Sequence, residues 1–395
     1  MSHVKILCIV ASFLLVTSAQ RSLPPCRRFI CVFKARHTLT KPYVISVSDV
    51  DPDLCTHILL YAAPLDGNKL STPYWEDDKR PGGIYDQLKQ LKVKKSKLKI
   101  LLTVGGHYSL GKPWTDMTAT EAGRREFIHF LIPFLRDREF DGVDLFWHWP
   151  GFLDGSAKSD RERYADLIKE MATAFKQETL IEGRKRLIFS AWGPKDPRMV
   201  DVGINVTAFA RYVDFVTVQA YNYNTAPDIP INHMTPLQSP DGRNIKDCLE
   251  YWVERGIPRP LINIALSAYG RRVYTQSSSD MTIGESMAKG KAPGGKYTHM
   301  EGALTYYEIC MLLKEGGKVG WDSLAQTPYH IQDKYFLTYE NEQSYKEKVR
   351  FLRKNCYGGF VIRTLEEDDF LGLECGKGKF PLTRTVKTEC TKRMN

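Results

Sequence analysis

Eight short runs rich in apolar and β-branched residues recur along the chain, and several are separated by segments with helical spacing. They begin at residues 29, 57, 99, 142, 186, 215, 262 and 358, with the sequences FICVF, HILLYAA, KILLTVGG, GVDLFW, RLIFSAW, FVTVQAY, INIALSAYG and GGFVIRTL. Nearly continuous apolar strands that alternate with helices require a parallel sheet covered on both faces. Eight such units predict an α/β fold of the closed (β/α)8 TIM barrel type.

One helical segment shows the pattern clearly, because its apolar residues recur at helical spacing behind a possible cap at Ser159 or Asp160. Those apolar residues are Tyr164, Leu167, Ile168, Met171 and Phe175.

The connection after the seventh run is too long for an ordinary loop between a strand and a helix. Residues 272–336 include turn-rich text such as KAPGGKYTHM. We expect them to form a small α+β insertion domain between strands seven and eight. The barrel would then comprise residues 22–271 and 337–385, followed by a basic C-terminal tail at residues 386–395.

The first nineteen residues have the features of a secretory signal peptide. Lys5 precedes an apolar run from Ile6 to Val16, and small residues follow as far as Ala19. We expect cleavage near Ala19 and a secreted, soluble, extracellular protein, because no later apolar run is long enough to span a bilayer. A membrane anchor is the alternative, and the shortness of the apolar core disfavours it.

Export gives the cysteines an expected role in disulfide bonds. Cys8 would leave with the signal peptide, and an even number of cysteines remains in the mature chain. These are Cys26, Cys31, Cys55, Cys248, Cys310, Cys356, Cys375 and Cys390. Their spacing matches no zinc site, and we expect no metal or other cofactor. Asn205 begins an Asn-Val-Thr sequon, which makes it a predicted glycosylation site in a secreted chain.

The formal net charge of +10 suggests affinity for anionic surfaces or polyanions. Part of that charge lies in a lysine-rich run at residues 92–99, which is typical of a solvated helix face. Nucleic acid is not an expected partner, because an exported chain with disulfide bonds rarely meets it.

The fourth run, within FDGVDLFWHWP at residues 140–150, carries polar groups in an unusual place. Side chains alternate along a strand, so Asp144, Phe146 and His148 share one face. In a barrel this face points to the interior, and barrel enzymes do their chemistry at the C-terminal ends of the strands. Asp144 and His148 are therefore candidate site residues. The residues that alternate with them should face the helices; they are Val143, Leu145 and Trp147.

Six segments, in order, resemble motifs of glycoside hydrolase family 18, which includes active chitinases and inactive chitinase-like lectins. KILLTVGGH resembles the family's Ser-x-Gly-Gly motif, DGVDLFWHWP its Asp-Gly-x-Asp-x-Asp-x-Glu motif, and VQAYNYN its Met-x-Tyr-Asp strand. SAYGRRV and EGALTYYEIC match segments that bracket its insertion, and GGFVIRTLEEDDF matches its last strand. The resemblance covers essentially the whole mature chain and implies a barrel with an insertion.

The same resemblance implies that catalytic groups have been lost. In the enzymes, a glutamic acid protonates the glycosidic oxygen while the substrate's N-acetyl carbonyl attacks, and an aspartate orients that acetamido group. These positions fall at His148 and Phe146, and a third acidic position falls at Asn222. We therefore predict no hydrolase activity. Weak hydrolysis with His148 as the acid is one alternative, and a hydrogen-bonded core histidine beside Asp144 is another.

The resemblance also implies changes in sugar binding. Tryptophans that stack on sugar rings in the family fall near Arg36, at His107 and at Arg363 in this chain. Other positions that line the family's cleft are retained; they are Tyr221, Tyr269, Arg271 and Glu301. Tyr269 and Arg271 could equally be retained for packing.

The substitutions replace carboxylates and aromatic rings with cations, including Lys34, His148 and Arg363. We expect the open end of the barrel to bind a sulfate, carboxylate or phosphate group on a glycan or a protein partner. The alternative is drift in an abandoned site, with Arg363 paired to a nearby acid. The candidates for that acid are Glu366, Glu367, Asp368 and Asp369.

The resemblance implies disulfide bonds between Cys31 and Cys55 and between Cys310 and Cys375. The four remaining cysteines allow three pairings. We favour Cys248 with Cys356 and Cys26 with Cys390, because neighbouring helix-to-strand segments and the two chain ends are plausible neighbours.

The sequence therefore predicts a secreted, monomeric, non-catalytic chitinase-like protein with a degenerate active site. Chitin, GlcNAc oligomers or anionic glycans are its expected ligands. A growth-factor-like role that binds a protein partner through the outer surface is the main alternative, and weak chitinase activity is the other.

Overall fold

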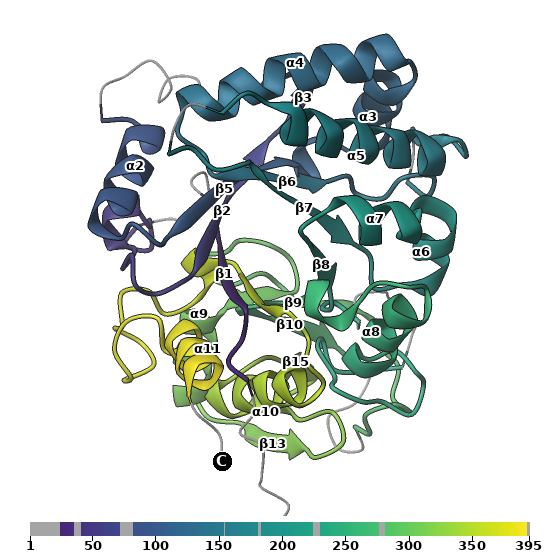
Figure 1. Cartoon of the computed structure of the whole chain (residues 1–395). Helices are drawn as coiled ribbons and strands as arrows, with labels where there is room; N and C mark the ends of the chain where they lie inside the picture. Colours follow the sequence, from purple (N-terminus) through teal and green to yellow (C-terminus); the bar gives the residue numbers. More distant parts are fainter. Residues whose placement is uncertain are drawn as a thin grey trace, which may run out of the picture.

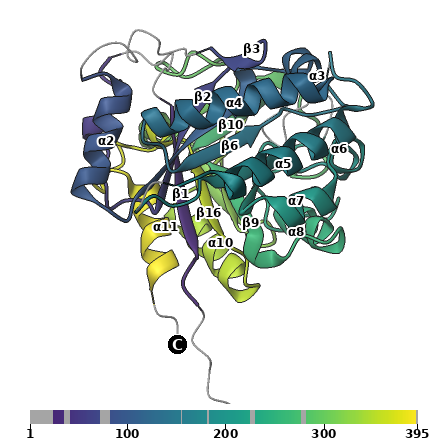
Figure 2. The ribbon, with the colours of Figure 1, turned by 45° about the horizontal axis from the view of Figure 1, so that its top comes forward.

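Eight parallel strands form a closed barrel in the computed structural model (Figures 1 and 2), with the order β1-β16-β9-β8-β7-β6-β5-β2. The structure describes residues 24–34, 41–71, 82–153, 155–180, 183–223, 230–275 and 281–392. The barrel strands are β1 (Arg28–Lys34), β2 (His57–Ala63), β5 (Lys99–Gly105), β6 (Gly142–Phe146), β7 (Ile188–Gly193), β8 (Phe215–Gln219), β9 (Ile262–Ser267) and β16 (Gly359–Arg363). Each predicted apolar run forms one of these strands, so the predicted (β/α)8 barrel is confirmed.

Helices lie around the outside of the barrel (Figure 1). They are α2 (Ile84–Lys94), α3 (Gly111–Thr118), α4 (Glu121–Asp137), α5 (Asp160–Gln177), α6 (Pro197–Gly203), α7 (Val206–Tyr212), α8 (Ile245–Glu254), α10 (Glu342–Lys354) and α11 (Pro381–Thr391). The predicted helix over residues 160–177 is present as α5, but the Ser159 side chain makes no capping bond. The Asp160 carboxylate instead accepts hydrogen bonds from Thr115 Oγ1 and from the backbone N–H of Ala157.

Strand alternation separates two apolar layers, as the sequence predicts for β6. Val143, Leu145 and Trp147 belong to the large core between strands and helices. Phe146 belongs to a second core inside the barrel. Bulky residues fill that interior; they include Ile30, Val32, Leu59, Tyr61, Leu101, Trp149, Trp192, Tyr221 and Val361.

A second, antiparallel sheet lies between β9 and β16 in the sequence, with the order β11-β10-β15-β14-β13 and with β12 paired to β10. Its elements are β10 (Tyr269–Tyr274), β11 (Gly290–Lys291), β12 (Ala303–Thr305), α9 (Tyr306–Lys314), β13 (Lys318–Asp322), β14 (Thr327–Gln332) and β15 (Tyr335–Thr338). A two-stranded hairpin of β3 (Leu65–Asp66) and β4 (Lys69–Leu70) follows β2. The second sheet extends a few residues beyond both ends of the predicted insertion domain, whose boundaries stay a prediction.

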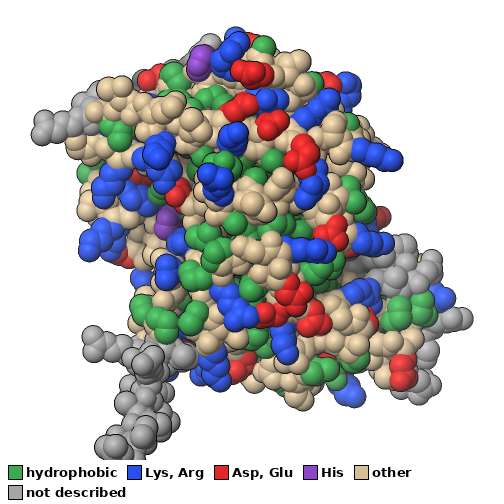
Figure 3. Space-filling model, turned by 45° about the vertical axis from the view of Figure 1, so that its right-hand side comes forward, with side chains coloured by type: hydrophobic (Ala, Val, Ile, Leu, Met, Phe, Trp, Pro, Cys, Tyr) green, Lys and Arg blue, Asp and Glu red, His purple; other side chains and the backbone are tan. Residues whose placement is uncertain are grey.

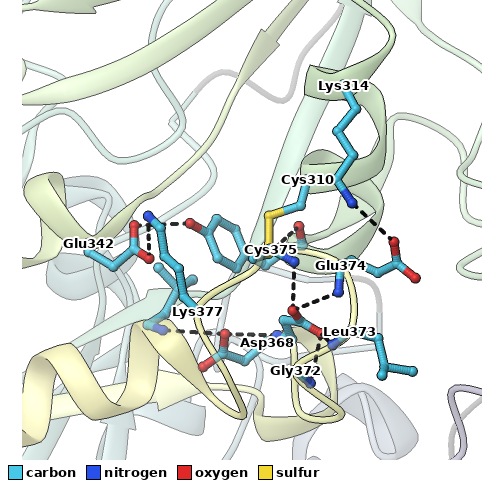
Figure 4. Close-up of a disulfide and its surroundings, with 12 residues drawn as sticks. Cys310, Lys314, Glu342, Asp368, Gly372, Leu373, Glu374, Cys375 and Lys377 are labelled. Atoms are coloured by element: carbon cyan, nitrogen blue, oxygen red, sulfur yellow. Dashed lines mark hydrogen bonds and ion pairs between the residues drawn. A yellow bond between two sulfur atoms is a disulfide. The ribbon is translucent and has the colours of Figure 1, made fainter.

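Three predicted disulfide bonds are present. Cys31–Cys55 links β1 to the loop just before β2, and Cys26–Cys390 links the start of the described chain to α11. Cys310–Cys375 joins α9 of the second sheet to the loop after the last barrel strand (Figure 4). The ion pair between Lys314 and Glu374 lies beside this bond, with Nζ and Oε2 3.6 Å apart.

The predicted fourth disulfide, Cys248–Cys356, is wrong, because both thiols are free. Cys248 is buried in the first turn of α8, which begins near the C-terminal ends of the strands. Cys356 is exposed after the last turn of α10, just before β16 begins at the opposite end of the barrel. The two residues occupy neighbouring helical segments but opposite ends of them.

The residues predicted to form a basic tail instead belong largely to helix α11. Pro381 occupies its first turn, and Leu382, Val386 and Cys390 are buried along one side of the helix. Helix packing and the Cys26–Cys390 bond therefore hold this segment against the barrel. None of the helices in the described segments combines the length and the apolar character that a membrane span needs.

Candidate functional site at the barrel mouth

The predicted site residues gather at the end of the barrel where the strands finish, and we call this region the barrel mouth. It comprises His107 in the turn after β5, Phe146 and His148 at the end of β6, Tyr221 and Asn222 after β8, Tyr269 and Arg271 on β10, and Arg363 at the end of β16. Arg36, which was also predicted here, lies outside the described residues.

Asp144 lies deeper in the barrel and is held as a hydrogen-bond acceptor. Its carboxylate accepts hydrogen bonds from Thr103 Oγ1 at 2.9 Å, Ser190 Oγ at 2.6 Å and Trp192 Nε1 at 2.7 Å. Burial raises the pKa of Asp144 to about 6, and these three donors oppose the shift. The carboxylate is fully buried beneath the mouth, so it is a structural anchor for three strands.

Phe146 closes the space above Asp144 with an aromatic stack. Its ring lies parallel to that of Trp192, with centroids 4.5 Å apart and planes 7° apart. Trp149 packs on the same ring at 5.5 Å. Phe146 and Trp192 are fully buried. The position that the family resemblance assigns to an orienting aspartate therefore offers only an apolar face.

His107 and His148 form an edge-to-face pair at the mouth, with ring centroids 4.7 Å apart. Burial, followed by the positive charges of Arg363 and Lys195, lowers the pKa of His148 to about 4. His107 lies at the exposed rim, and desolvation by its neighbours, followed by the charge of Arg363, also lowers its pKa below the ordinary value. Both rings are therefore neutral at pH 7 in the free protein.

His148 is not the hydrogen-bonded core histidine that the sequence allowed as an alternative. Its Nδ1 is buried and has no hydrogen-bond partner among the described residues. Asp144, which was its suggested partner, directs both oxygens to other donors. A buried ring nitrogen without a partner is available to a ligand that enters the mouth.

Arg363 is a buried cation at the centre of the mouth, with 8% of its surface exposed. Its guanidinium carbon lies 5.2 Å from the ring centroid of Tyr61 and 6.0 Å from that of Tyr221. Its Nε is buried without a hydrogen-bond partner, and no described carboxylate lies within ion-pair distance of it. Buried charges are normally paired, so this guanidinium stands out.

The four acids considered as internal partners of Arg363 have other surroundings. Asp368 accepts hydrogen bonds from Thr383, and Asp369 accepts them from the backbone of the following loop. Glu367 accepts from the backbone N–H of Thr364, and its charge acts on Arg363 only at longer range. Glu366 is buried with both oxygens unpaired among the described residues, and burial, followed by the charge of Glu367, raises its pKa to about 7. None of these acids forms the suggested ion pair.

A small polar network supports the other side of the mouth. Asn222 Oδ1 accepts hydrogen bonds from Tyr269 Oη at 2.9 Å and from Arg271 Nε at 3.4 Å. Arg271 also donates to the backbone carbonyl of Glu301 at 3.4 Å, while the Glu301 residue is exposed. Tyr221 packs edge to face against Tyr269, and its hydroxyl is buried without a partner in the part of the chain that the structure describes.

Sequence reasoning missed three contributors to this region: Trp192, Tyr61 and Lys195. Trp192 ends the fifth run, RLIFSAW, and its place at a strand end was a usable signal. Tyr61 receives a hydrogen bond from the backbone N–H of His107 at 2.9 Å, which no sequence pattern indicates. Lys195 follows the same strand as Trp192, in GPKDP.

Asn205, the predicted glycosylation site, lies on the outside of the barrel as the cap of α7. Its Oδ1 accepts a hydrogen bond from Ala208 N–H, and its Nδ2 donates to Glu162 at 3.1 Å. The residue is partly exposed, and its glycosylation stays a prediction.

The mouth therefore combines a cation, two neutral imidazoles and aromatic walls, without a carboxylate in the place of the family's acid. Such a set of groups can bind an anion through hydrogen bonds and charge. No group of three or more His, Cys, Asp or Glu side chains in the described segments is arranged to hold a metal ion.

A closed parallel barrel with a second sheet before its last strand, and with its candidate site at the strand ends, defines the class as a (β/α)8 TIM barrel with an inserted sheet. The chain belongs to glycosyl hydrolases family 18, whose model matches residues 28–368. It is 35% identical to Mus musculus chitotriosidase-1 over 348 residues, covering 86% of this chain and 73% of that protein. It is 34% identical to Homo sapiens oviduct-specific glycoprotein over 90% of this chain, but spans only 52% of that longer protein.

Solved structures of the family have the same fold. Human YKL-39, reported as a pseudo-chitinase with retained chitooligosaccharide binding, superposes with a TM-score of 0.84 at 28% identity, covering 93% of this chain and 100% of that chain. The Group IV chitinase of Ostrinia furnacalis in complex with allosamidin gives a TM-score of 0.85 at 27% identity, covering 92% of this chain and 98% of that chain. The family thus contains both chitinases and a pseudo-chitinase of closely similar fold.

Proposed function

We propose that this chain is a secreted, non-hydrolytic member of the family that binds an anionic sugar at the barrel mouth. The observation that carries the proposal is the Arg363 guanidinium, which is buried at the mouth without a carboxylate partner among the described residues. An anionic group on a ligand would supply that partner. Each of the two neutral histidines beside it has one ring N–H that could donate a hydrogen bond to the same anion.

The lack of hydrolysis is argued from the side chains at the end of β6. Phe146 is stacked on Trp192 and has no atom that could orient an acetamido group. His148, with its pKa lowered to about 4, is a neutral imidazole at pH 7 and so lacks the acidic imidazolium proton that a general acid would transfer. Acetamido-assisted cleavage needs both functions together.

A glycan ligand is favoured by the family relatives and by the retained side of the mouth. YKL-39 is reported to retain chitooligosaccharide binding as a pseudo-chitinase. Here Tyr269 and Arg271 are joined through Asn222, which preserves a polar wall beside Tyr221. An uncharged chitooligosaccharide is therefore the competing ligand for the same site. The three disulfide bonds favour an extracellular location.

A binding comparison tests the ligand class. Calorimetric titration would use a heparin tetrasaccharide and, separately, chitotetraose, with the wild-type chain and with Arg363→Met. Arg125→Met, on the exposed outer surface of α4, is the matched control for loss of one arginine. We expect Arg363→Met to weaken heparin tetrasaccharide binding at least tenfold and the control to leave it unchanged.

Other results of that titration would change the proposal. Equal heparin binding by the two variants would remove Arg363 from the site, and binding of chitotetraose alone would make the ligand a neutral one. Binding of neither sugar would favour a protein partner on the outer surface. Figure 3 shows one face of the outer surface, on which both basic and acidic side chains lie exposed.

A fluorogenic chitobioside assay from pH 4 to pH 7.5 tests the absence of hydrolysis. We expect no turnover above background. Turnover that His148→Ala abolishes would instead establish an enzyme that uses His148 as its acid.

A further inference from the structure

A hollow lies beside the mouth, between the ends of β7 and β8 and the beginning of α8. Its volume is about 550 Å³, within the range of small-molecule sites. It is lined by Lys195, Asp196, Pro197, Arg198, Asn222, Tyr223, Gly242, Arg243, Asn244, Asp247, Cys248 and Tyr251. We call it the β7–α8 pocket.

Lys195 differs from the two other cations of this pocket. Arg198 pairs with Asp196 at 2.9 Å, and Arg243 pairs with Asp241 at 2.6 Å. Lys195 has no ion pair with any described residue, and its Nζ lies 5.6 Å from the ring centroid of Tyr223. Desolvation by burial lowers the pKa of Lys195, and the nearby Cys248 and Asp196 oppose this shift only in part.

The acids that line the pocket are engaged in local contacts. Asp196 caps α6 by accepting a hydrogen bond from the backbone N–H of Arg198 at 2.9 Å, in addition to its ion pair. Asp247 accepts a hydrogen bond from Asn244 Nδ2 at 2.8 Å. Lys195 is therefore the charged group of the pocket that a ligand could still pair with.

The remaining walls of the pocket are largely apolar. Tyr223 is buried, with 8% of its surface exposed. Its hydroxyl lies beside the Cys248 thiol and has no other partner in the described chain. A thiol is only a weak hydrogen-bonding group, so this hydroxyl is close to unsatisfied. Pro197 and the ring of Tyr251 complete the apolar surface. Among the residues that the structure describes, the pocket thus has one cation without an ion pair, one hydroxyl close to unsatisfied and a largely apolar lining.

We propose that the β7–α8 pocket binds a small amphipathic anion, with a carboxylate, sulfate or sulfonate group on Lys195 and an aromatic or aliphatic body against Tyr223, Pro197 and Tyr251. This site is distinct from the one proposed for the glycan, because Arg363, His107 and His148 do not line it, although the charge of Lys195 reaches His148. Asn222 is the wall that the two sites share.

The test uses the full chain and two fluorescent probes of similar shape. One is 8-anilinonaphthalene-1-sulfonate, an aromatic anion, and the other is the uncharged N-phenyl-1-naphthylamine. We expect the anion to bind the wild-type chain saturably with one site. Lys195→Met should lower the affinity for the anionic probe at least tenfold and should change the affinity for the uncharged probe by less than twofold. Lys195→Arg, which keeps the charge, should restore most of the anion's affinity.

Two control variants locate the site. Arg198→Met removes a rim cation that is already paired, and Arg363→Met removes the cation of the mouth, so both should bind the anionic probe like the wild type. Equal affinity of Lys195→Met and Arg198→Met for the anion, or no saturable binding by the wild type, overturns the proposal. Loss of anion binding in Arg363→Met would also overturn it, by moving the probe to the mouth. If Lys195→Met does not fold, Lys195→Gln replaces it, with the same expected result.

Discussion

Two buried cations of this molecule have opposite surroundings. Lys348 of α10, at the contact between the barrel and the second sheet, forms an ion pair with Glu340 and is 1% exposed. The Glu340 carboxylate also accepts hydrogen bonds from Thr235 and Ser344, and Lys348 donates to Thr327 at 3.2 Å. Arg363 at the barrel mouth is almost as deeply buried, but it has aromatic rings around it and no such acceptor in the described chain.

The difference separates a structural group from a candidate ligand-binding group. A buried charge is tolerated in a stable core when its partners are built into the fold, as they are around Lys348. An unpaired buried charge lowers stability, and proteins retain such groups mainly at functional sites. The unpaired Nδ1 of His148 and hydroxyl of Tyr221 lie in the same region as Arg363, which strengthens the interpretation of the mouth as a binding site.

The largest expected effect is the loss of stability when Lys348, the buried cation with a built-in partner, is replaced. Lys348→Met leaves Glu340 buried without its counter-charge, and we expect the free energy of unfolding to fall by about 3–5 kcal/mol. Urea denaturation measures this. Lys346→Met, on the same helix but partly exposed, should change it by less than about 0.5 kcal/mol. A loss below about 1 kcal/mol for Lys348→Met would mean that the ion pair is not structural.

Loss of the Cys310–Cys375 disulfide, which ties the second sheet to the barrel, should have the next largest effect on stability. Replacing Cys310 and Cys375 by serine opens a link across a sequence separation of 65 residues. We expect a loss of about 2–4 kcal/mol in the same denaturation experiment, because the unfolded chain gains conformational freedom. The matched control is Cys356→Ser, which removes an exposed free thiol and should have almost no effect. An equal response of the two variants would show that this bond does not hold the second sheet to the barrel.

Arg363→Met should have a much smaller effect on stability than Lys348→Met. It removes an unpaired buried charge and the contact of that charge with two rings, effects that oppose each other. We expect the free energy of unfolding to stay within about 1 kcal/mol of the wild type or to rise. Urea denaturation of Arg363→Met and Lys348→Met compares their free energies of unfolding directly. If Arg363→Met lost as much stability as Lys348→Met, Arg363 would have a structural role, and the two buried cations would not differ in the way proposed.

The barrel could be predicted from the sequence because its eight strands are buried on both faces and therefore appear as nearly unbroken apolar runs. The location of the candidate site followed from the fold, since the strand ends meet at one mouth and strand alternation turns Phe146 inward. The proposed loss of the catalytic acid at His148 rests on one motif of the sequence, DGVDLFWHWP.

Other features depend on distances that no pattern encodes. The absence of a partner for Arg363 is a property of where four nearby acids point, and the sequence could only name them. The error at Cys248 and Cys356 has the same cause, since adjacent helical segments say nothing about which ends face each other. Helix α11 did have a usable signal, with proline in its first turn and Leu382, Val386 and Cys390 at helical spacing.

The smallest predicted effect concerns pH and the two histidines of the mouth. Their pKa values are lowered in the folded state, His148 to about 4, so the unfolded chain binds more protons at these positions between about pH 4 and pH 6.5. Stability contributed by the neutral rings is therefore full above pH 6.5 and decreases as pH falls through that window. We expect the melting temperature of the wild type to fall more between pH 7 and pH 5 than that of His107→Gln/His148→Gln.

The double variant isolates the histidines because the carboxyls of Asp144 and Glu366, whose raised pKa values act in the opposite direction, are present in both proteins. We expect the two melting curves to differ in their pH response by roughly 2–4 °C. Identical responses would mean that the rings are not held neutral in the folded chain. Addition of a bound anion should shrink the difference, because a negative charge at the mouth raises the histidine pKa values toward those of the unfolded chain. Scanning calorimetry at pH 7 and pH 5, with and without the heparin tetrasaccharide, measures both effects. It therefore tests whether the proposed ligand changes the pH dependence of stability through the two histidines.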